Sequence, residues 1–475
     1  MKLPPYPEYK DSGISWLGKI PAHWNKYNLR QILQQVSERN EPDLPLLSIV
    51  REKGVILRNI SSKKENHNYI PDDLSNYKVV RRKQFAMNKM KAWQGSYGIS
   101  ELDGIVSPAY FVFGVDKVEA YFFHTAIRSK KYVPFFTQAS DGVRVGQWDL
   151  NVDRMKDIPF FIPTESEQEQ ILKFIKWHSS QINKFIRNKR RLIDLLKEQK
   201  QNIINKAVTR GINPNVRLKP SGVDWIGDIP KHWEVIRLKN CITKMEQGWS
   251  PQCESTQAAY NQFGVLKVGC VNGDTLNVSQ NKKLPESLYG TPGLQCLSIH
   301  AGDILVSRAN TKLLVGLAAF SPKDYDKVLL CDKLFRFRAK DNAIPRYITH
   351  SIRLASSRAQ VESQTNGASS SMQNIGQGVI KNLWIMLPSV EEQEEICIYI
   401  DGATASIDTA IAKAERQIQL MTEYRDRLIA DVVTGKVDVR GVTVPEVMEE
   451  EQPDLMDAED LSDIEFEDTL EENEA

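Results

Sequence analysis

Residues 12–24 read SGISWLGKIPAHW and residues 221–233 read SGVDWIGDIPKHW, so one motif occurs twice, 209 positions apart. A second motif also occurs twice, as IPTESEQEQI at 162–171 and LPSVEEQEEI at 387–396, and these copies lie 225 positions apart. A motif that recurs in the same order indicates a chain built from copies of one unit. The sequence therefore predicts two half-proteins whose middle segments differ in length by 16 residues.

The middle segments differ from one another much more than the motifs that flank them. They cover roughly 26–160 and 235–385, and no extended stretch of one matches the other. A duplication under uniform constraint would not leave similar flanks around dissimilar middles. We interpret the flanks as a shared frame that carries two different heads.

The frame has the pattern of a long helix after each copy of the second motif. Thr164 can cap a helix whose first turn holds three glutamates, which are favourable near the positive end of the helix dipole. The residues that follow alternate in steps of four and three, which is typical of a coiled coil. The pattern predicts a helix over about 165–207, about 60 Å long, that ends before Gly211 and Pro214. Its predicted contact positions are Ile171, Ile175, His178, Ile182, Phe185, Lys189, Leu192, Leu196, Gln199 and Ile203.

A second helix starts at Ser389 and repeats this design with smaller residues. Its predicted contact positions are Ile396, Ile400, Ala403, Ile407, Ala410, Ala414, Ile418, Met421 and Leu428. Two long helices with one apolar stripe each are expected to pack on one another, and an antiparallel pairing would place one head at each end. We interpret the polar residues His178, Lys189 and Gln199 as devices that fix the register of the pair rather than as ligands.

The heads show short strand-like runs between turn residues, which predicts mixed α/β (α+β) structure without giving a strand order. These runs are Gly114-Val115, Ala120–Phe123, Gly264–Val268, Asp303–Val306 and Leu334–Phe337. The predicted fold is two globular heads joined by two long helices packed as an antiparallel coiled coil, with a pseudo-twofold internal repeat. The predicted boundaries are an N-terminal head over 1–163, a central helical spacer over 164–214, a C-terminal head over 215–388, a second helical spacer over 389–440 and an acidic tail over 441–475.

The net charge of +1 conceals an uneven distribution of charge along the chain. Residues 446–475 contain 15 acidic and no basic residues, which leaves 46 acidic and 62 basic residues over 1–445, a net charge of +16. A basic body suits a polyanion such as nucleic acid. The tail is expected to be disordered, and it either solvates the protein or competes with DNA for the basic surface.

Neither a membrane span nor a secretory signal is expected, because apolar runs are short or interrupted by charges and the N-terminus lacks a basic segment followed by an apolar one. All six cysteines lie in the second half without a C-x-x-C pair. We interpret them as free thiols of a cytoplasmic protein rather than as metal ligands or disulfides.

Each head places a basic residue with amide neighbours just after a short apolar run. RRKQFAMNKMKAWQGSYG from Arg81 aligns with AGDILVSRANTKLLVG from Ala301, which pairs Lys89 with Arg308. Arginine and lysine can bond guanine, and asparagine and glutamine can bond adenine, so these clusters could read bases; the alternative is a solvated turn that meets only phosphates. The first cluster is Asn88, Lys89, Lys91, Trp93 and Gln94, and the second is Ser307, Arg308, Asn310 and Lys312.

Further candidates lie close to these clusters in the sequence. Arg81 and Arg82 belong to a basic triplet suited to phosphate, and Arg144, Ser369 and Ser370 lie in loops before the helical frame. The repeated aromatic residues of the first motif recur in the frame rather than in the heads, so we expect them to pack. They are Trp16, His23 and Trp24 in the first copy and Trp225, His232 and Trp233 in the second.

No catalytic motif is found in the chain. Leu3-Pro4-Pro5-Tyr6 imitates the element that binds a flipped adenine, but it lacks the polar first residue and the glycine-rich loop for S-adenosylmethionine. Glu198-Gln199-Lys200 has part of the appearance of a nuclease site but falls inside the predicted helix. Neither a nucleotide-binding loop nor a zinc-protease motif occurs, so we expect no catalytic residue, no metal and no cofactor in this chain.

The doubled W-[IL]-G-x-I-P-x-H-W and the doubled P-x-x-x-E-Q-x-x-I, each leading into a long helix, resemble the specificity subunits of type I restriction–modification systems. The resemblance covers about residues 8–440, and NKMKAWQGSYG with DGIVSPAY resembles a target recognition domain of that family. It implies that each head reads one half of a split DNA site and that the paired helices set the gap. It also implies two methylation subunits that use S-adenosylmethionine and two motor–nuclease subunits that use ATP and Mg²⁺.

Two other functions remain open from the residues alone. One is a self-contained restriction or modification enzyme with a divergent active site, and the purified chain alone would then be active. The other is a coiled-coil scaffold that binds no nucleic acid, which would explain the helices but not a basic body with two dissimilar heads.

Overall fold

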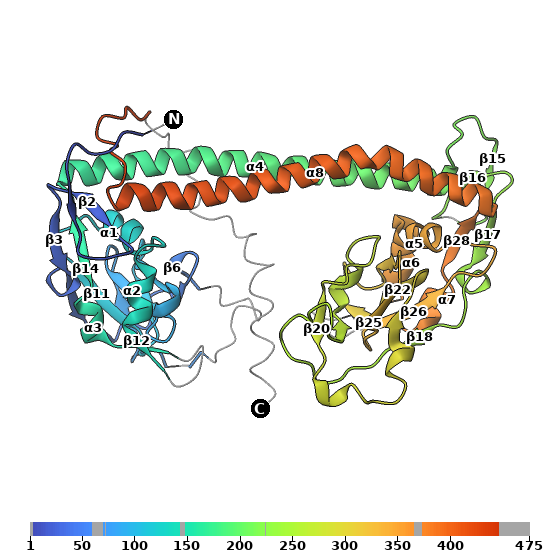
Figure 1. The fold of residues 1–475 in the computed structure, drawn as a ribbon, viewed down its shortest axis with the longest axis horizontal. Helices are drawn as coiled ribbons and strands as arrows, with labels where there is room; N and C mark the ends of the chain where they lie inside the picture. The colour runs from blue at the N-terminus through green and yellow to red at the C-terminus, as the bar shows by residue number, and fades with distance from the viewer. Residues whose placement is uncertain are drawn as a thin grey trace. The chain divides into compact units, whose positions relative to one another are not determined.

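The computed structural model describes residues 3–58, 70–71, 73–142, 148–223, 225–364 and 373–445. The chain divides into two compact units, of which the first combines residues up to Arg191 with residues from Glu415 onward and the second is Leu192–Ala414 (Figure 1). Each unit contains one head and part of each long helix. The acidic residues from 446 onward, which form most of the predicted tail, lie outside the described residues.

Both heads are built around a four-stranded antiparallel sheet. In the first unit the strand order is β4 (Leu33–Val36), β11 (Phe111–Val115), β8 (Phe85–Met87) and β9 (Tyr97–Ile99). In the second unit it is β18 (Glu246–Gln247), β26 (Leu334–Arg338), β22 (Asp303–Ser307) and β24 (Ala318–Phe320). The dissimilar middle segments therefore form central sheets with the same order of strands along the chain.

The repeated flanks also form corresponding strand pairs. In the first unit β1 (Tyr9–Asp11) pairs with β2 (Lys19–Pro21), and β3 (Asn25–Asn28) pairs with β14 (Pro159–Ile162). In the second unit β15 (Leu218–Pro220) pairs with β16 (Asp228–Pro230), and β17 (Glu234–Arg237) pairs with β28 (Trp384–Leu387). β14 and β28 lead into the long helices, so each motif copy connects its head to the frame.

The remaining elements distinguish the two heads. The first adds the strand pairs β5 (Leu47–Val50) with β6 (Gly54–Leu57), β7 (Lys78–Val80) with β10 (Gly104–Val106) and β12 (Ser140–Asp141) with β13 (Asp149–Leu150), and the helices α1 (Ala120–Ile127), α2 (Val133–Gln138) and α3 (Val152–Lys156). The second adds a sheet of β20 (Asn281–Lys283), β19 (Gly264–Leu266), β25 (Tyr325–Leu329) and β21 (Ser298–Ile299), the pair β23 (Ala309–Asn310) with β27 (Gln373–Asn374), and the helices α5 (Pro345–Arg353), α6 (Ala355–Glu362) and α7 (Gln377–Lys381). The expectation of mixed α/β structure is confirmed.

The two long helices are α4 (Glu165–Arg210) and α8 (Val390–Val433), and they pack on one another (Figure 1). In the first unit Arg425 of α8 donates to Asn183 of α4 over 2.9 Å. In the second unit Lys200 of α4 donates to Asp408 of α8 over 2.7 Å. Asn183 precedes Lys200 in α4, whereas its partner Arg425 follows Asp408 in α8. The two helices therefore run antiparallel.

The buried positions agree with the prediction for α8 but not for the second half of α4. In α4 the predicted Ile171, Ile175 and Ile182 are buried, after which Ile186 and Ile193 take the contact positions in place of Phe185 and Leu192. The predicted positions Phe185, Leu192 and Ile203 were each wrong by one residue, whereas the predicted Leu196 is half-buried. A strict seven-residue repeat drifts by about 20° per heptad on a helix of 3.6 residues per turn, and the extra step of four from Ile182 to Ile186 corrects that drift.

One strand expectation was also wrong: Ala120–Phe123 begins helix α1 rather than forming a strand. The side chain of Glu119 accepts a hydrogen bond of 2.7 Å from the amide of Phe122, which caps the helix. A short apolar run without alternation does not distinguish a buried strand from a buried helix.

The long helices belong to the cores of the heads. In the first unit Phe174 of α4 and Val432 of α8 lie in one apolar cluster with Trp24. In the second unit Val208 of α4 and Ile396 of α8 lie in one cluster with Trp233, to which α5 contributes Tyr347. Packing at the ends of α4 and α8 therefore fixes each helix end to a head.

After α8 the chain packs against the N-terminal residues of the first unit. The amide of Asp438 donates to the carbonyl of Pro4 over 2.8 Å, and the hydroxyl of Tyr9 donates to the carbonyl of Lys436 over 3.0 Å. Residues near both ends of the described chain thus pack together in that unit. Among the described residues, no helix is both long enough and apolar enough to span a bilayer.

Candidate nucleic-acid interface

The repeated motifs meet at a buried glutamate in the first unit. Glu167, in the first turn of α4, accepts hydrogen bonds from the Trp24 indole (3.0 Å) and the Tyr6 hydroxyl (2.6 Å), and it contacts the His23 ring (2.7 Å). Burial and the neighbouring Glu167 carboxylate hold the pKa of Tyr6 well above its usual value. The expectation that Trp24 packs within the frame is confirmed, since its side chain is buried.

The second unit repeats this contact with two of the three partners. Glu392 accepts from the Trp233 indole over 3.0 Å and contacts the His232 ring at 2.8 Å. Trp225 does not follow the packing expectation, because it is 53% exposed. Its counterpart Trp16 stacks on Phe135, with ring centroids 4.8 Å apart, and the residue 225 positions after Phe135 is the polar Gln360.

The glutamine of the second motif ties each long helix to a short helix of its head. Gln168 accepts from the amide of Glu119 over 2.8 Å, just before α1. Gln393 accepts from the amide of Ile344 over 2.9 Å, just before α5. These glutamines are buried, so the frame holds both heads by the same hydrogen bond.

The strand register supports the alignment of Lys89 with Arg308. Each residue lies just beyond the end of its strand, in the loop that follows β8 or β22. The carbonyl of Lys89 accepts from the amide of Leu150 over 3.2 Å, and the carbonyl of Arg308 accepts from the amide of Ile375 over 3.0 Å. Leu150 and Ile375 are 225 positions apart, so both the strand and its neighbouring segment match.

The first cluster gathers several of its predicted residues on one loop. Lys91 is exposed, and Lys89 is half-buried in an ion pair with Asp149. Asn88 is nearly buried: its side chain donates to the Tyr110 hydroxyl over 3.2 Å and accepts from the amide of Met90 over 3.1 Å. Asn88 therefore shapes the loop, while the two lysines are presented by it.

The aromatic side of this loop is packed rather than free. Trp93 and Trp148 stack with ring centroids 5.3 Å apart, and the Trp93 indole N–H is buried without a hydrogen-bond partner among the described residues. Gln94 is half-buried. Trp93 could stack on an extruded base only after leaving Trp148.

The second cluster also contains one buried residue that stabilises the loop and several residues that are accessible on its surface. The fully buried Ser307 donates to the carbonyl of Leu314 over 2.6 Å and accepts from the amide of Leu317 over 3.1 Å. Arg308 and Asn310 are half-buried and Lys312 is exposed. Ser307 has no exposed surface to offer to a base, whereas the other three residues do.

The basic triplet is less available than its sequence suggests. The Arg81 guanidinium donates to Glu38 and Glu41, and these side-chain hydrogen bonds raise its pKa further above its usual value. Asp103 lies 3.8 Å from the same guanidinium. A phosphate would have to compete with three carboxylates for Arg81, while Arg82 is exposed. Arg144, Ser369 and Ser370 lie outside the described residues.

Comparison with known proteins finds a family model that matches part of the chain. Residues 230–419 match the model of the type I restriction modification DNA specificity domain. The EcoEI type I specificity subunit of Escherichia coli is 29% identical over 204 residues, which are 42% of this chain and about a third (34%) of that protein. The putative MjaX type I specificity subunit of Methanocaldococcus jannaschii is 22% identical over 89% of this chain and 96% of that protein.

The chain is therefore similar to type I restriction–modification specificity subunits, and the family model covers residues 230–419 of its 475 residues. A chain from a solved type I R-M system, studied for complex assembly and conformational transition, has the same fold, with a TM-score of 0.56 and 15% identity over 88% of this chain and 99% of that one. The resemblance to type I specificity subunits that the sequence motifs indicate is confirmed by these matches.

The structure adds residues that sequence reasoning missed. Asp149 pairs with Lys89, and no signal in the sequence brings the two together, because they are 60 positions apart. In the second head Gln247 donates to the carbonyl of Asp332 over 3.0 Å. Arg308 approaches the same carbonyl at 3.5 Å, so Gln247 belongs to the candidate interface.

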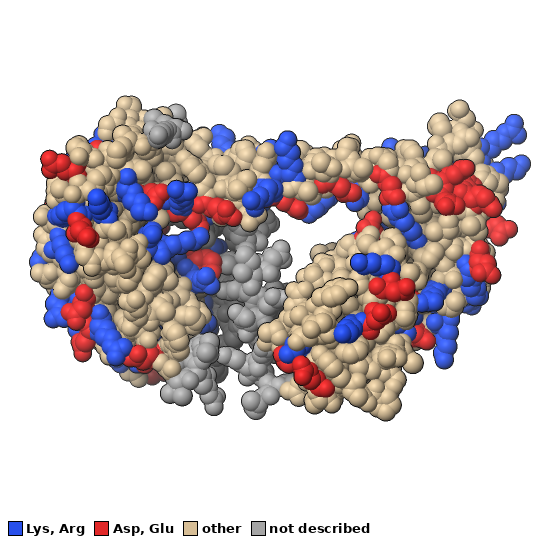
Figure 2. Space-filling view, viewed as in Figure 1, with Lys and Arg blue, Asp and Glu red and all other residues tan. Residues whose placement is uncertain are grey.

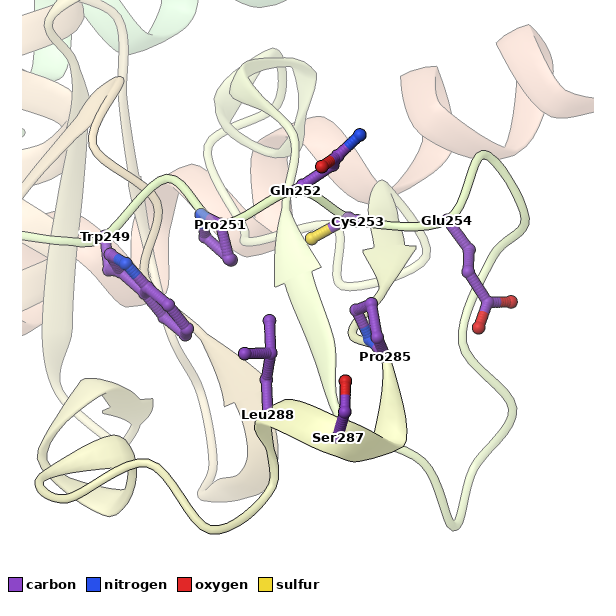
Figure 3. A pocket seen from close by; sticks show the side chains of 8 residues that line it. All are labelled: Trp249, Pro251, Gln252, Cys253, Glu254, Pro285, Ser287 and Leu288. Atoms are coloured by element: carbon purple, nitrogen blue, oxygen red, sulfur yellow. The ribbon is translucent and has the colours of Figure 1, made fainter.

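An open pocket of about 590 Å³ lies in the second head, and Trp249 is one of the residues that line it. Figure 3 shows Trp249, Pro251, Pro285 and Leu288 forming an apolar wall, with Glu254 at one side. The amide of Trp249 donates to the carbonyl of Leu330 over 3.2 Å. Trp249 is a third residue missed from the sequence, because it follows a two-residue strand that has no detectable period.

The basic residues of the chain are spread over its surface. Figure 2 shows Lys and Arg side chains interspersed with Asp and Glu over both units on the side in view, rather than gathered in one basic field. Such a surface attracts a polyanion weakly over its whole area and leaves orientation to local contacts. The loops after β8 and β22 are the matched places where such contacts can form.

The sites rejected from the sequence have structural roles. Lys200 bridges α4 to Asp408, and Tyr6 donates to Glu167. No group of three or more potential metal ligands occurs in the part of the chain that the structure describes. Burial raises the pKa of the thiols of Cys241, Cys331 and Cys397 to about 11, which keeps them protonated at neutral pH.

Proposed function

We propose that this chain is the sequence-reading subunit of a type I restriction–modification complex and that each head reads one half of a split, asymmetric DNA site. The observation that carries the proposal is the matched placement of Lys89 and Arg308. Lys89 follows β8 and Arg308 follows β22, which occupy the same position in their sheets. Their carbonyls accept hydrogen bonds from the amides of Leu150 and Ile375. A shared scaffold that presents one variable side chain per head is what two-part sequence recognition requires.

The two heads are proposed to read different base pairs because their matched loops differ. The first presents Lys89 and Lys91, and the second presents Arg308, Asn310 and Lys312. The planar guanidinium of arginine can bond guanine O6 and N7 bidentately. The ammonium of lysine is a point charge without that fixed geometry. The site read by the whole chain is therefore asymmetric.

The frame is proposed to dock two copies of one methylation subunit and to set the gap between half-sites. The corresponding strand pairs and the matched contacts of Glu167 and Glu392 give each half a similar surface, which suits two copies of one partner. Because α4 and α8 each run through both units, a change of helix length should alter the gap. Inserting one heptad into each helix keeps the contact positions and tests this proposal.

The chemistry is proposed to belong to the partners of this chain. The methylation subunits would transfer a methyl group from S-adenosylmethionine to adenine, and two motor–nuclease subunits would use ATP and Mg²⁺ to translocate and cleave DNA. This chain would bind none of these cofactors itself and would act in the cytoplasm.

The test is genome-wide mapping of adenine methylation in cells that express the chain with its neighbouring methylation subunit. We expect a split motif that is absent from cells lacking the chain. Lys89→Ala should relax one half-site and Arg308→Ala the other, whereas Lys26→Ala, an exposed lysine of β3, should leave the motif unchanged. A folded complex that produces no split motif would contradict the proposal.

A further inference from the structure

A carboxylate stands beside the basic residue of the first candidate loop, where a DNA-binding surface should avoid negative charge. The side chain of Asp149 forms an ion pair with Lys89, and the two side chains remain 49% and 37% exposed. An anion facing DNA is repelled by phosphates. If Asp149 lies at the DNA surface, a favourable contact with a base must offset this repulsion.

The pair is held rigidly by its surroundings. Asp149 belongs to β13, and the amide of the next residue, Leu150, bonds the carbonyl of Lys89 over 3.2 Å. Trp148 precedes Asp149 and stacks on Trp93. Both members of the pair thus extend from one packed base, and such preorganisation is what base reading needs.

The same place in the second head holds a neutral amide. Asn374 precedes Ile375, whose amide bonds the carbonyl of Arg308 over 3.0 Å, just as Asp149 precedes Leu150. Asn374 is exposed. The two heads therefore present a basic residue with an adjacent acid in one case, and a basic residue with an adjacent amide in the other.

An adjacent ammonium and carboxylate match the major-groove edge of one G·C base pair. Guanine offers the acceptors N7 and O6, and cytosine offers the N4 amino donor next to O6. The ammonium can face both guanine acceptors while the carboxylate accepts from cytosine N4. On an A·T pair the carboxylate would have to reach the adenine amino group beside the acceptor N7, which repels it.

We propose that Asp149 is a specificity-determining residue and that Lys89 and Asp149 together read one G·C base pair. This inference rests on the proposed function and adds the identity of one base pair to it. The ion pair present without DNA keeps both side chains oriented. At the matched position, Arg308 and Asn374 present a different set of donors and acceptors, so the second head reads a different pattern there.

The experiment compares Asp149→Asn and Asn374→Asp in the complete methylation complex, since each variant installs the residue of the other head. Asp141→Asn is the matched control. Asp141 lies opposite Asp149 in the same strand pair, and it is an exposed aspartate that bonds Arg154 over 2.9 Å. Methylated motifs are mapped for each variant, and DNA binding is measured with oligonucleotides that carry each base pair at every half-site position.

We expect Asp149→Asn to lower discrimination for G·C at one position of one half-site by roughly tenfold, the scale of losing one good base contact. Asn374→Asp should change one position of the other half-site, and Asp141→Asn should change neither. An Asp149→Asn complex that reads every position as before would overturn the inference while leaving the proposed function intact. Absence of a split motif with the unsubstituted chain would instead overturn the proposed function.

Discussion

Each long helix begins with a glutamate that accepts from a tryptophan, yet the two glutamates lie in different surroundings. The side chain of Glu167 is 2% exposed and has three partners. The side chain of Glu392 is 22% exposed and has two, one of them the half-exposed His232. A buried group that loses a charged partner pays the full cost of desolvation, so the same substitution should have unequal effects.

We predict that Glu167→Ala destabilises the first unit by about 3 kcal/mol and that Glu392→Ala destabilises the second by about 1 kcal/mol. Hydrogen exchange read by peptide separates the two units, because local opening reports the stability of each region. The two variants serve as controls for each other. Equal losses of protection would show that the Tyr6 hydroxyl bond adds nothing.

A second prediction concerns His350, a buried residue of α5 whose ring nitrogens have no hydrogen-bond partner among the described residues. Burial lowers the pKa of His350 to about 4, and the nearby Asp274 opposes that shift. The unfolded chain, with a histidine pKa near 6.5, therefore binds more protons than the folded chain between about pH 4 and 6.5. The contribution of His350 to stability is full above that window and falls as pH drops through it, by about 1.4 kcal/mol per pH unit.

His350→Leu should remove this part of the acid sensitivity and leave stability at neutral pH nearly unchanged. The measurement is the difference in unfolding midpoint between the variant and the unsubstituted chain at pH 7.5 and pH 5. His124 is the comparison, since burial lowers its pKa to about 3 while its ring also accepts from the amide of Ile99. His124→Leu should therefore destabilise at both pH values, and a pH-independent difference for His350→Leu would contradict the argument.

At the scale of elements, the helices could be predicted closely and the sheets could not. Helix ends follow from local residues such as Thr164 and Gly211, and contact positions follow from a period within one segment. β22 has five buried residues in succession, so it shows no alternation of polar and apolar residues. Its neighbour β26 lies some 30 positions along the chain, and nothing local specifies that pairing.

The same limits apply to the candidate site. The candidate residues after β8 and β22 could be selected from the sequence because they directly follow an apolar run, and the strand register supports that placement. It could not show that Asn88 and Ser307 are turned inward. It also could not bring Asp149 next to Lys89, which are 60 positions apart.

The corrected contact positions of α4 give a prediction at this scale. Ile186 is 6% exposed and Leu192 is 40% exposed, whereas the strict seven-residue pattern selects Leu192 and omits Ile186. Ile186→Ala should cost about 2 kcal/mol or more and Leu192→Ala well under half as much. Thermal unfolding of the two variants measures the difference. A larger loss of stability for Leu192→Ala would show that Leu192, and not Ile186, is the contact position.

At the scale of the whole molecule, similar flanks around dissimilar heads predict that recognition is modular. Replacing residues 235–385 with the corresponding head of another specificity subunit should change one half-site and leave the other intact. The exchanged segment lies within the second unit and begins and ends in the strand pair β17–β28. Methylation mapping reads the result, and full retention of both half-sites would contradict modular reading.

The first unit combines residues from both ends of the chain, and this affects how the protein folds during synthesis. The second unit, Leu192–Ala414, is one continuous segment, whereas the first needs residues from Glu415 onward. Trp24 packs with Val432 and Val433, which a ribosome adds some 400 residues later. Domains generally fold as units while synthesis proceeds. Here the head that leaves the ribosome first must wait with an exposed apolar surface until the other head has been translated, so chaperone demand during synthesis should fall on the N-terminal half.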